Sequence, residues 1–168
     1  MSTTALLTFA EFEKLPDMPG KQELINGQLI TMAPPENKHS LILARIFSLL
    51  LTRWPVGRAW GDHTGYRMGD GWIEPDASVS WPDQPQDDKY LLRAPMVAVE
   101  ILSPGEDIDE KLTLYFDEGA LEVWVINVRR ETMTVYLRSN GTVTRLKVEG
   151  EYHSAAADAT VSLPAIFS

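Results

Sequence analysis

Three acidic residues and one lysine stand out because of the segments in which they lie. Glu100 interrupts the otherwise apolar, strand-like residues 96–102, and Asp76 opens the alternating segment that follows Pro75. Glu23 lies near the start of a further strand-like segment, and Lys111 follows Glu100 by one helical segment. A carboxylate inside an apolar strand costs several kcal/mol of desolvation unless a cation or metal ion compensates it. Glu100 is therefore the starting point for a functional interpretation.

These residue types fit metal-assisted hydrolysis of a phosphodiester. Carboxylates held on rigid strands suit Mg²⁺, or Mn²⁺ in its place, because Mg²⁺ takes a few carboxylates, several waters and the substrate's phosphate as ligands. Such an ion neutralises charge that develops in phosphoryl transfer and lowers the pKa of water. An ammonium group beside it can orient the attacking water or stabilise the pentavalent phosphate.

Each of the four residues also allows a purely structural interpretation. Glu23 could be an exposed carboxylate at the end of a strand, and Asp76 could accept hydrogen bonds in a turn. Glu100 could be solvated if its strand lay at the edge of a sheet. Lys111 could be a surface residue paired with Asp107 four residues earlier. The residues are common and the spacing is loose, so the pattern alone does not choose between these readings.

The composition excludes several other classes of protein. The chain has 168 residues, 44% of them hydrophobic and 23% charged, which is ordinary for a globular protein. It has no cysteine, so disulfides and thiolate metal sites are excluded. The three histidines show no zinc spacing, and His39 is expected to face solvent or to cap its helix. A net charge of −9 argues against a broad basic surface for nucleic acid.

The chain shows no signal for a membrane. Its first residues carry no basic region or cleavage site of a signal peptide. The longest apolar run, residues 41–51, is broken by Arg45 and Ser48 and is too short to cross a bilayer. A soluble, cytoplasmic protein without a membrane partner is therefore expected.

The pattern of strands and helices predicts one α/β domain over residues 1–168. Thr8 and Glu11 suit a capping box for a short N-terminal helix. Residues 22–32 are predicted to form a hairpin around Asn26-Gly27, which favours a type I′ turn. Residues 39–54 have almost no polar face, which predicts a helix buried between other elements.

Most of the remaining segments are predicted to form strands. Residues 58–68 and 72–81 are predicted strands, and residues 82–93 a polar loop. In strand 96–102, Glu100 shares one face with Ala98 and Leu102. A helix follows that begins near Asp107 and ends at Gly119. Residues 122–128, 133–138 and 143–148 predict a β-meander, and the C-terminal tail is expected to pack back onto the domain.

The ordered segments resemble the Uma2 family, also described as DUF820 and as a putative restriction endonuclease domain. The resemblance rests on ELINGQLITMAPP, on a helix opened by His39, on IEPDASVSW, and on VAVEILSPGEDIDEKLTLYFDEGALEVWVIN. It covers residues 9–137, and the string over residues 99–124 is its most specific part. It implies an α/β (α+β) fold with a restriction-endonuclease-like PD-(D/E)XK core. In that core a mixed central β-sheet is flanked by helices, and a β-meander is added.

The resemblance also implies roles for individual residues. Asp76 of PDAS and Glu100 of VEILSP would be metal ligands, and Glu23 of ELINGQL would complete the acidic cluster. The lysine of the usual (D/E)-x-K motif is absent, because Leu102 stands two residues after Glu100. Lys111 of DEKLTLY would replace it from the following helix.

Two further residues of that helix match the family pattern, and two positions depart from it. Asp107 and Tyr115 would support the site. Asn127 stands where the family usually has aspartate, and Val123 where it usually has tyrosine, so a supporting polar contact is in doubt. Neither change touches the proposed metal ligands.

The expectation from the sequence is therefore a Mg²⁺-dependent endonuclease that hydrolyses DNA. A homodimer would suit cleavage of both strands of a duplex. Two alternatives remain open: a catalytically inactive nuclease-fold module that binds a partner, and a metal-dependent hydrolase of another phosphodiester. Fold and site can persist after an activity is lost.

Overall fold

A six-stranded mixed sheet forms the centre of the structure, a computed structural model that describes residues 5–168. Its strand order is β11-β10-β9-β8-β6-β3. The two middle strands, β8 and β9, run parallel, and every other neighbouring pair is antiparallel. The strands are β3 (Ala59–Trp60), β6 (Ala77–Val79), β8 (Val97–Leu102), β9 (Glu122–Asn127), β10 (Thr132–Ser139) and β11 (Thr142–Lys147). The last three form the predicted β-meander.

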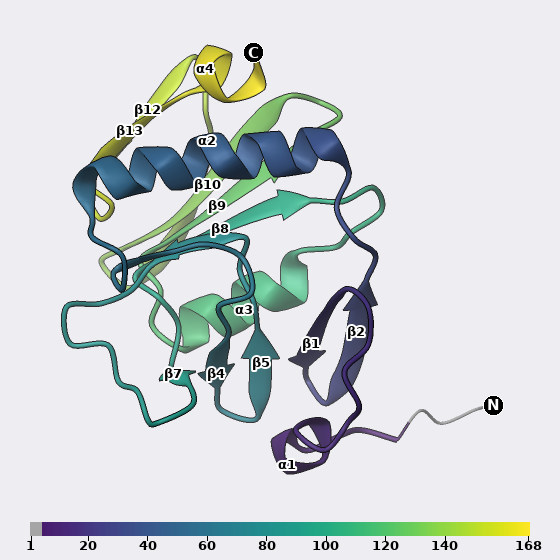
Figure 1. The fold of residues 1–168 in the computed structure, drawn as a ribbon. Helices are drawn as coiled ribbons and strands as arrows, with labels where there is room; N and C mark the ends of the chain where they lie inside the picture. The colour runs from purple at the N-terminus through teal and green to yellow at the C-terminus, as the bar shows by residue number, and fades with distance from the viewer. Residues whose placement is uncertain (1–4) are drawn as a thin grey trace.

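Two helices cover opposite faces of this sheet (Figure 1). Helix α3 (Asp109–Asp117) connects β8 to the parallel β9, as a crossover between parallel strands requires. Helix α2 (Asn37–Arg53) lies across the other face and buries Ile42, Ile46 and Leu50. The prediction that this helix is buried between other elements is wrong for one of its sides. Its outer side faces solvent, where Leu41 and Leu51 are 49% and 39% exposed, because no element of residues 5–168 covers that side.

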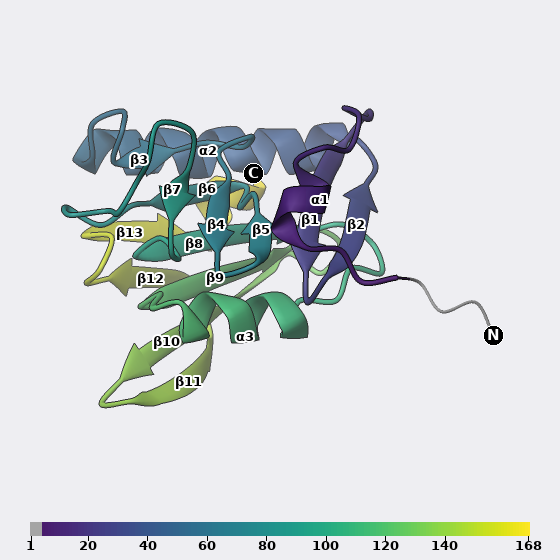
Figure 2. The same cartoon turned by 90° about the horizontal axis from the view of Figure 1, so that it is seen from below.

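A second sheet packs on the α3 side of the first. Its order is β2-β1-β5-β4-β7, and its strands are β1 (Lys21–Ile25), β2 (Gln28–Met32), β4 (Tyr66–Met68), β5 (Gly71–Ile73) and β7 (Leu91–Leu92). Figure 2 shows these short strands on the same side of the central sheet as α3. The predicted hairpin turn is confirmed, since Asn26 and Gly27 connect β1 to β2 with φ values of 51° and 77°.

Two segments that were each predicted to be one strand are divided between the two sheets. Residues 58–68 form β3 and β4, which belong to different sheets, and residues 72–81 likewise divide into β5 and β6. Pro75 has no N–H to donate and interrupts the second segment; His63, with a φ of 62°, turns the chain within the first. Residues 82–93 are not wholly a loop, because β7 lies within them and pairs with β4.

The two ends of the chain follow their local signals. Helix α1 (Phe9–Phe12) begins with the predicted capping box of Thr8 and Glu11. The C-terminal tail packs back as expected, through strands β12 (Glu151–Ser154) and β13 (Ala159–Ser162) and helix α4 (Leu163–Phe167). The β12–β13 hairpin was not predicted. Among the described residues, no helix is long and apolar enough to cross a membrane.

Gly20 allows β1 to start directly beside the end of β2, and we expect Gly20→Ala to destabilise the fold by about 2–4 kcal/mol. Its φ is +94°, and an added Cβ would lie 2.1 Å from the carbonyl oxygen of Met32. Gly57→Ala is the matched control, because Gly57 has a φ of +91° but no atom within 4 Å of the added Cβ. Urea unfolding of both variants measures the difference. Equal losses would show that the close approach to Met32 is unimportant.

Candidate active site

Glu100 lies in the interior of the central sheet and not at its edge. Strand β8 is flanked by β6 and β9, so the interpretation of Glu100 as a solvated edge residue is wrong. Its side chain points to the α3 face, and the residue is 1% exposed. The hydroxyl of Tyr115 donates to Glu100 Oε1 at 2.6 Å, and Lys111 Nζ lies 3.3 Å from Oε2. Helix α3 therefore supplies both groups that meet this buried carboxylate.

Lys111 is enclosed by three carboxylates. Its Nζ lies 2.7 Å from Glu23 Oε2, 3.3 Å from Glu100 Oε2 and 3.2 Å from Glu106 Oε1, and the residue is 2% exposed. Burial alone would lower the pKa of Lys111, but the three carboxylates outweigh it and raise that pKa. The interpretation of Lys111 as a surface partner of Asp107 is wrong. Asp107 is exposed and accepts from the N–H of Asp109 at 2.9 Å, which supports the start of α3.

Glu23 is fully buried, so the interpretation of it as an exposed strand-end carboxylate is also wrong. Its Oε1 accepts from the backbone N–H of Glu74 at 3.1 Å and lies 3.6 Å from Lys21 Nζ. Its Oε2 makes the ion pair with Lys111. Glu23 thus connects the second sheet to α3.

Asp76 lies at the start of β6, where the chain passes from one sheet to the other. Its Oδ2 accepts from the N–H of Ile101 at 2.6 Å, and its Oδ1 lies 3.5 Å from both Lys21 Nζ and His39 Nε2. Burial would raise the pKa of Asp76, but the hydrogen bond from His39 and the charge of Lys21 outweigh burial and lower it. This carboxylate is therefore held in its charged form.

The four predicted residues converge, and three more join them that sequence reasoning missed: Lys21, His39 and Glu106. Lys21 could have been found, because it lies two residues before Glu23 and shares its face of β1. The prediction that His39 faces solvent or caps α2 is wrong, since its side chain is 11% exposed and turns toward Asp76. Burial would lower the pKa of His39, but its contact with Asp76 raises that pKa.

The charges of this cluster fit a divalent cation, although the carboxylates do not form a ready cage. Over residues 5–168, no three His, Asp or Glu side chains are spaced to enclose a metal ion. Lys21 and Lys111 lie among the four carboxylates instead, and an excess of negative charge remains. Mg²⁺ needs only one or two carboxylates besides water and phosphate. Asp76 Oδ1 and Glu100 Oε2 are the candidate ligand oxygens, because their contacts with Lys21, His39 and Lys111 are 3.3–3.5 Å long.

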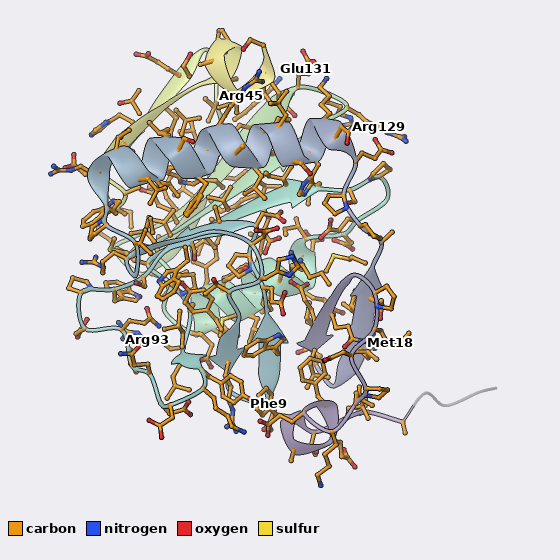
Figure 3. All side chains as sticks on the ribbon, viewed as in Figure 1. Phe9, Met18, Arg45, Arg93, Arg129 and Glu131 are labelled. Atoms are coloured by element: carbon orange, nitrogen blue, oxygen red, sulfur yellow. The ribbon has the colours of Figure 1, made fainter. Side chains whose placement is uncertain are left out.

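A cavity of about 230 Å³ gives access to Asp76. Lys21, His39, Asp76 and Glu106 line it together with other residues from both sheets. Figure 3 shows side chains filling the interior between α2, the central sheet and α3. A substrate phosphate entering the cavity would meet Lys21 and His39 beside Asp76.

Burial raises the pKa of Glu100 from 4.5 to about 7, against the lowering effect of Lys111 and Lys21. Between these two values the folded protein holds a proton that the unfolded chain releases, so stability falls as pH rises. We expect metal-free Glu100→Gln to match wild type near pH 4.5 and to exceed its stability by about 1–3 kcal/mol at pH 8. Urea unfolding in EDTA across this range measures the difference. A difference independent of pH would contradict the raised pKa.

The fold and this cluster define the class of protein. The α+β architecture, with a buried acidic and lysine-containing site at one end of a mixed sheet, is that of a restriction-endonuclease-like nuclease fold. The sequence matches the Uma2 family, described as "Putative restriction endonuclease", over residues 9–165. The chain belongs to the Uma2 family.

A solved structure has the same fold throughout. It is the crystal structure of a "putative nuclease belonging to DUF820" from Anabaena variabilis ATCC 29413, with a TM-score of 0.80 and 25% sequence identity. The match covers 96% of this chain and 97% of that one. No curated protein matches the chain.

Proposed function

We propose that this protein is a Mg²⁺-dependent endonuclease that hydrolyses phosphodiester bonds in DNA, with Mn²⁺ able to replace Mg²⁺. The observation that carries the proposal is the burial of Lys111 among Glu23, Glu100 and Glu106, close to Asp76 at an open cavity. Buried charges of this kind are expensive to maintain and often mark a functional site. Membership of a family described as "Putative restriction endonuclease" supports the reaction class.

The proposed roles follow from the contacts of each carboxylate. Asp76 and Glu100 would hold the ion, and Glu23 would complete the acidic cluster. When bound, the ion supplies charge stabilisation at the phosphate and lowers the pKa of water. The N–H of Ile101 fixes Asp76, and the hydroxyl of Tyr115 fixes Glu100, so neither carboxylate needs to reorganise fully.

The cationic side chains would act on the substrate. Lys111, held by its ion pairs with Glu23 and Glu100, would orient the attacking water and stabilise charge on the phosphate. Lys21 and His39 lie at the cavity, where they would bind the phosphate and offset its repulsion from the acidic cluster. The charge on His39 is favoured by Asp76, so its contribution would weaken as pH rises.

Cleavage of plasmid and linear DNA by purified protein tests the proposal. We expect cleavage with Mg²⁺ or Mn²⁺, none in EDTA, and a loss of about 10³-fold or more in Asp76→Asn. Asp158→Asn is the matched control, because Asp158 pairs with Arg53 at the surface. Equal cleavage by wild type and Asp76→Asn would exclude Asp76 from the reaction.

One observation favours the alternative of a catalytically inactive binding module. Two ammonium groups already compensate part of the charge of the four carboxylates, and no three-ligand cage exists among residues 5–168. Calorimetric titration with Mg²⁺ separates the two functions. A folded protein that neither binds Mg²⁺ nor cuts DNA would support the module, and one that cuts only other phosphodiesters in a substrate panel would support a different hydrolase.

A further inference from the structure

A second cavity, of about 330 Å³, lies beside the candidate active site and has an aromatic wall. We call it the aromatic pocket; its phenylalanine, tryptophan and tyrosine lining residues are Phe9, Phe12, Trp72 and Tyr90. The ring centroids of Trp72 and Tyr90 are 5.2 Å apart, and those of Phe12 and Trp72 are 6.5 Å apart. Figure 3 shows Phe9 at α1, the end of the molecule at which this pocket lies. Its volume is at the lower end of the range for small-molecule sites.

The polar groups of the aromatic pocket suit a base and not a phosphate. Gln22 lines it, and the buried Gln22 Nε2 has no hydrogen-bond partner within the described part of the chain. A buried donor without a partner costs free energy, and a turn of the Gln22 side chain toward the cavity would let a ligand's acceptor recover it. The carboxylates of Glu13 and Glu74, which accept from Tyr90 and Trp72, also line the pocket. They would repel a phosphate but could accept from an exocyclic amino group.

The aromatic pocket adjoins the cavity of the candidate active site. Gly20 and His63 line both cavities. Neighbouring residues of β1 point to opposite faces, so Glu23 points into the acidic cluster while Gln22 lines the pocket. Glu74 connects the acidic cluster to the aromatic pocket, because its N–H donates to Glu23 and its Oε1 accepts from Trp72 Nε1. A strand with a phosphate in the active site could therefore reach the pocket over Gly20 and His63.

We propose that the aromatic pocket binds one unpaired nucleobase of the DNA strand whose phosphate lies in the active site. The inference rests on the proposed nuclease function and extends it to the form of the substrate. Trp72 supplies the stacking surface, and Gln22 donates to an acceptor on the base edge. A base inside a duplex cannot enter such a pocket unless it is unstacked and unpaired. The preferred substrate is therefore DNA with an unpaired nucleotide near the cleaved bond.

Binding of three DNA duplexes tests this inference. One contains a single unpaired nucleotide, the second has an abasic site at that position, and the third is fully paired. Fluorescence anisotropy in Ca²⁺ measures affinity without requiring cleavage. We expect wild type to bind the unpaired base about tenfold more tightly than the abasic site, as the loss of one stacked base implies.

Four variants test whether this preference arises from the pocket. Trp72→Leu and Gln22→Met should each reduce it, whereas Trp81→Leu should keep it, because Trp81 lines neither cavity. Trp72→Phe retains a ring and should keep part of the preference, which separates stacking from a general loss of structure. Circular dichroism confirms that each variant folds.

The outcomes distinguish this inference from the proposed function. A wild type that binds unpaired base and abasic site equally overturns the inference, whether or not it cuts DNA with Mg²⁺. A preference that persists in Trp72→Leu also overturns it. A preference for the base without any cleavage overturns the nuclease function and leaves the pocket assigned. Absence of DNA binding overturns both.

Discussion

Replacing Lys111 with methionine is expected to abolish DNA cleavage and to destabilise the protein by about 3–5 kcal/mol. The ammonium group of Lys111 is buried among three carboxylates, so its removal leaves their charges without this partner. The same change removes the group that would orient water and stabilise the phosphate, which costs about 10²-fold or more in rate. Urea unfolding and a plasmid cleavage assay measure the two effects.

Two controls separate loss of the fold from loss of chemistry. Lys147→Met removes an exposed lysine of β11 and should change neither property. The double variant Lys111→Met/Glu100→Gln removes one carboxylate together with the ammonium, so it should recover part of the stability and none of the activity. Recovery of cleavage in the double variant would remove Lys111 from the reaction.

Replacing Glu100 with glutamine is expected to reduce cleavage by about 10³-fold or more while the metal-free protein becomes no less stable. Glutamine keeps the shape of the side chain and can still accept from Tyr115, but it lacks the charge that would hold Mg²⁺. Activity and stability thus change in opposite directions, as expected where a buried charge serves function. The cleavage assay and Mg²⁺ calorimetry measure the loss.

Glu149→Gln is the matched control, because Glu149 is exposed between β11 and β12. This variant should cut DNA like wild type. If Glu100→Gln cut DNA as well as wild type, Glu100 would have no role in metal binding. A large loss of stability in Glu100→Gln would instead show that its carboxylate is mainly structural. The contrast with Lys111→Met is informative, since the two residues touch each other and yet have opposite expected effects on stability.

The sequence by itself determined the local features. The capping box of α1, the Asn26-Gly27 turn and the β-meander follow from residues near one another in the chain, and all three are present. Alternation along β8 correctly placed Glu100 on the face opposite Val97 and Val99, because the two-residue period is a property of the strand itself. The resemblance to Uma2 also identified the family and its nuclease fold.

Only the tertiary structure decided how these elements are shared between sheets and which side chains meet. The segments 58–68 and 72–81 each divide between two sheets, since strand pairing depends on partners far away in the sequence. The same long-range packing buries Lys111, turns His39 toward Asp76, and leaves the outer face of α2 exposed. Periodicity reports which face of an element a residue occupies. The neighbour that covers that face is chosen by packing across the whole fold, so a local pattern cannot predict it.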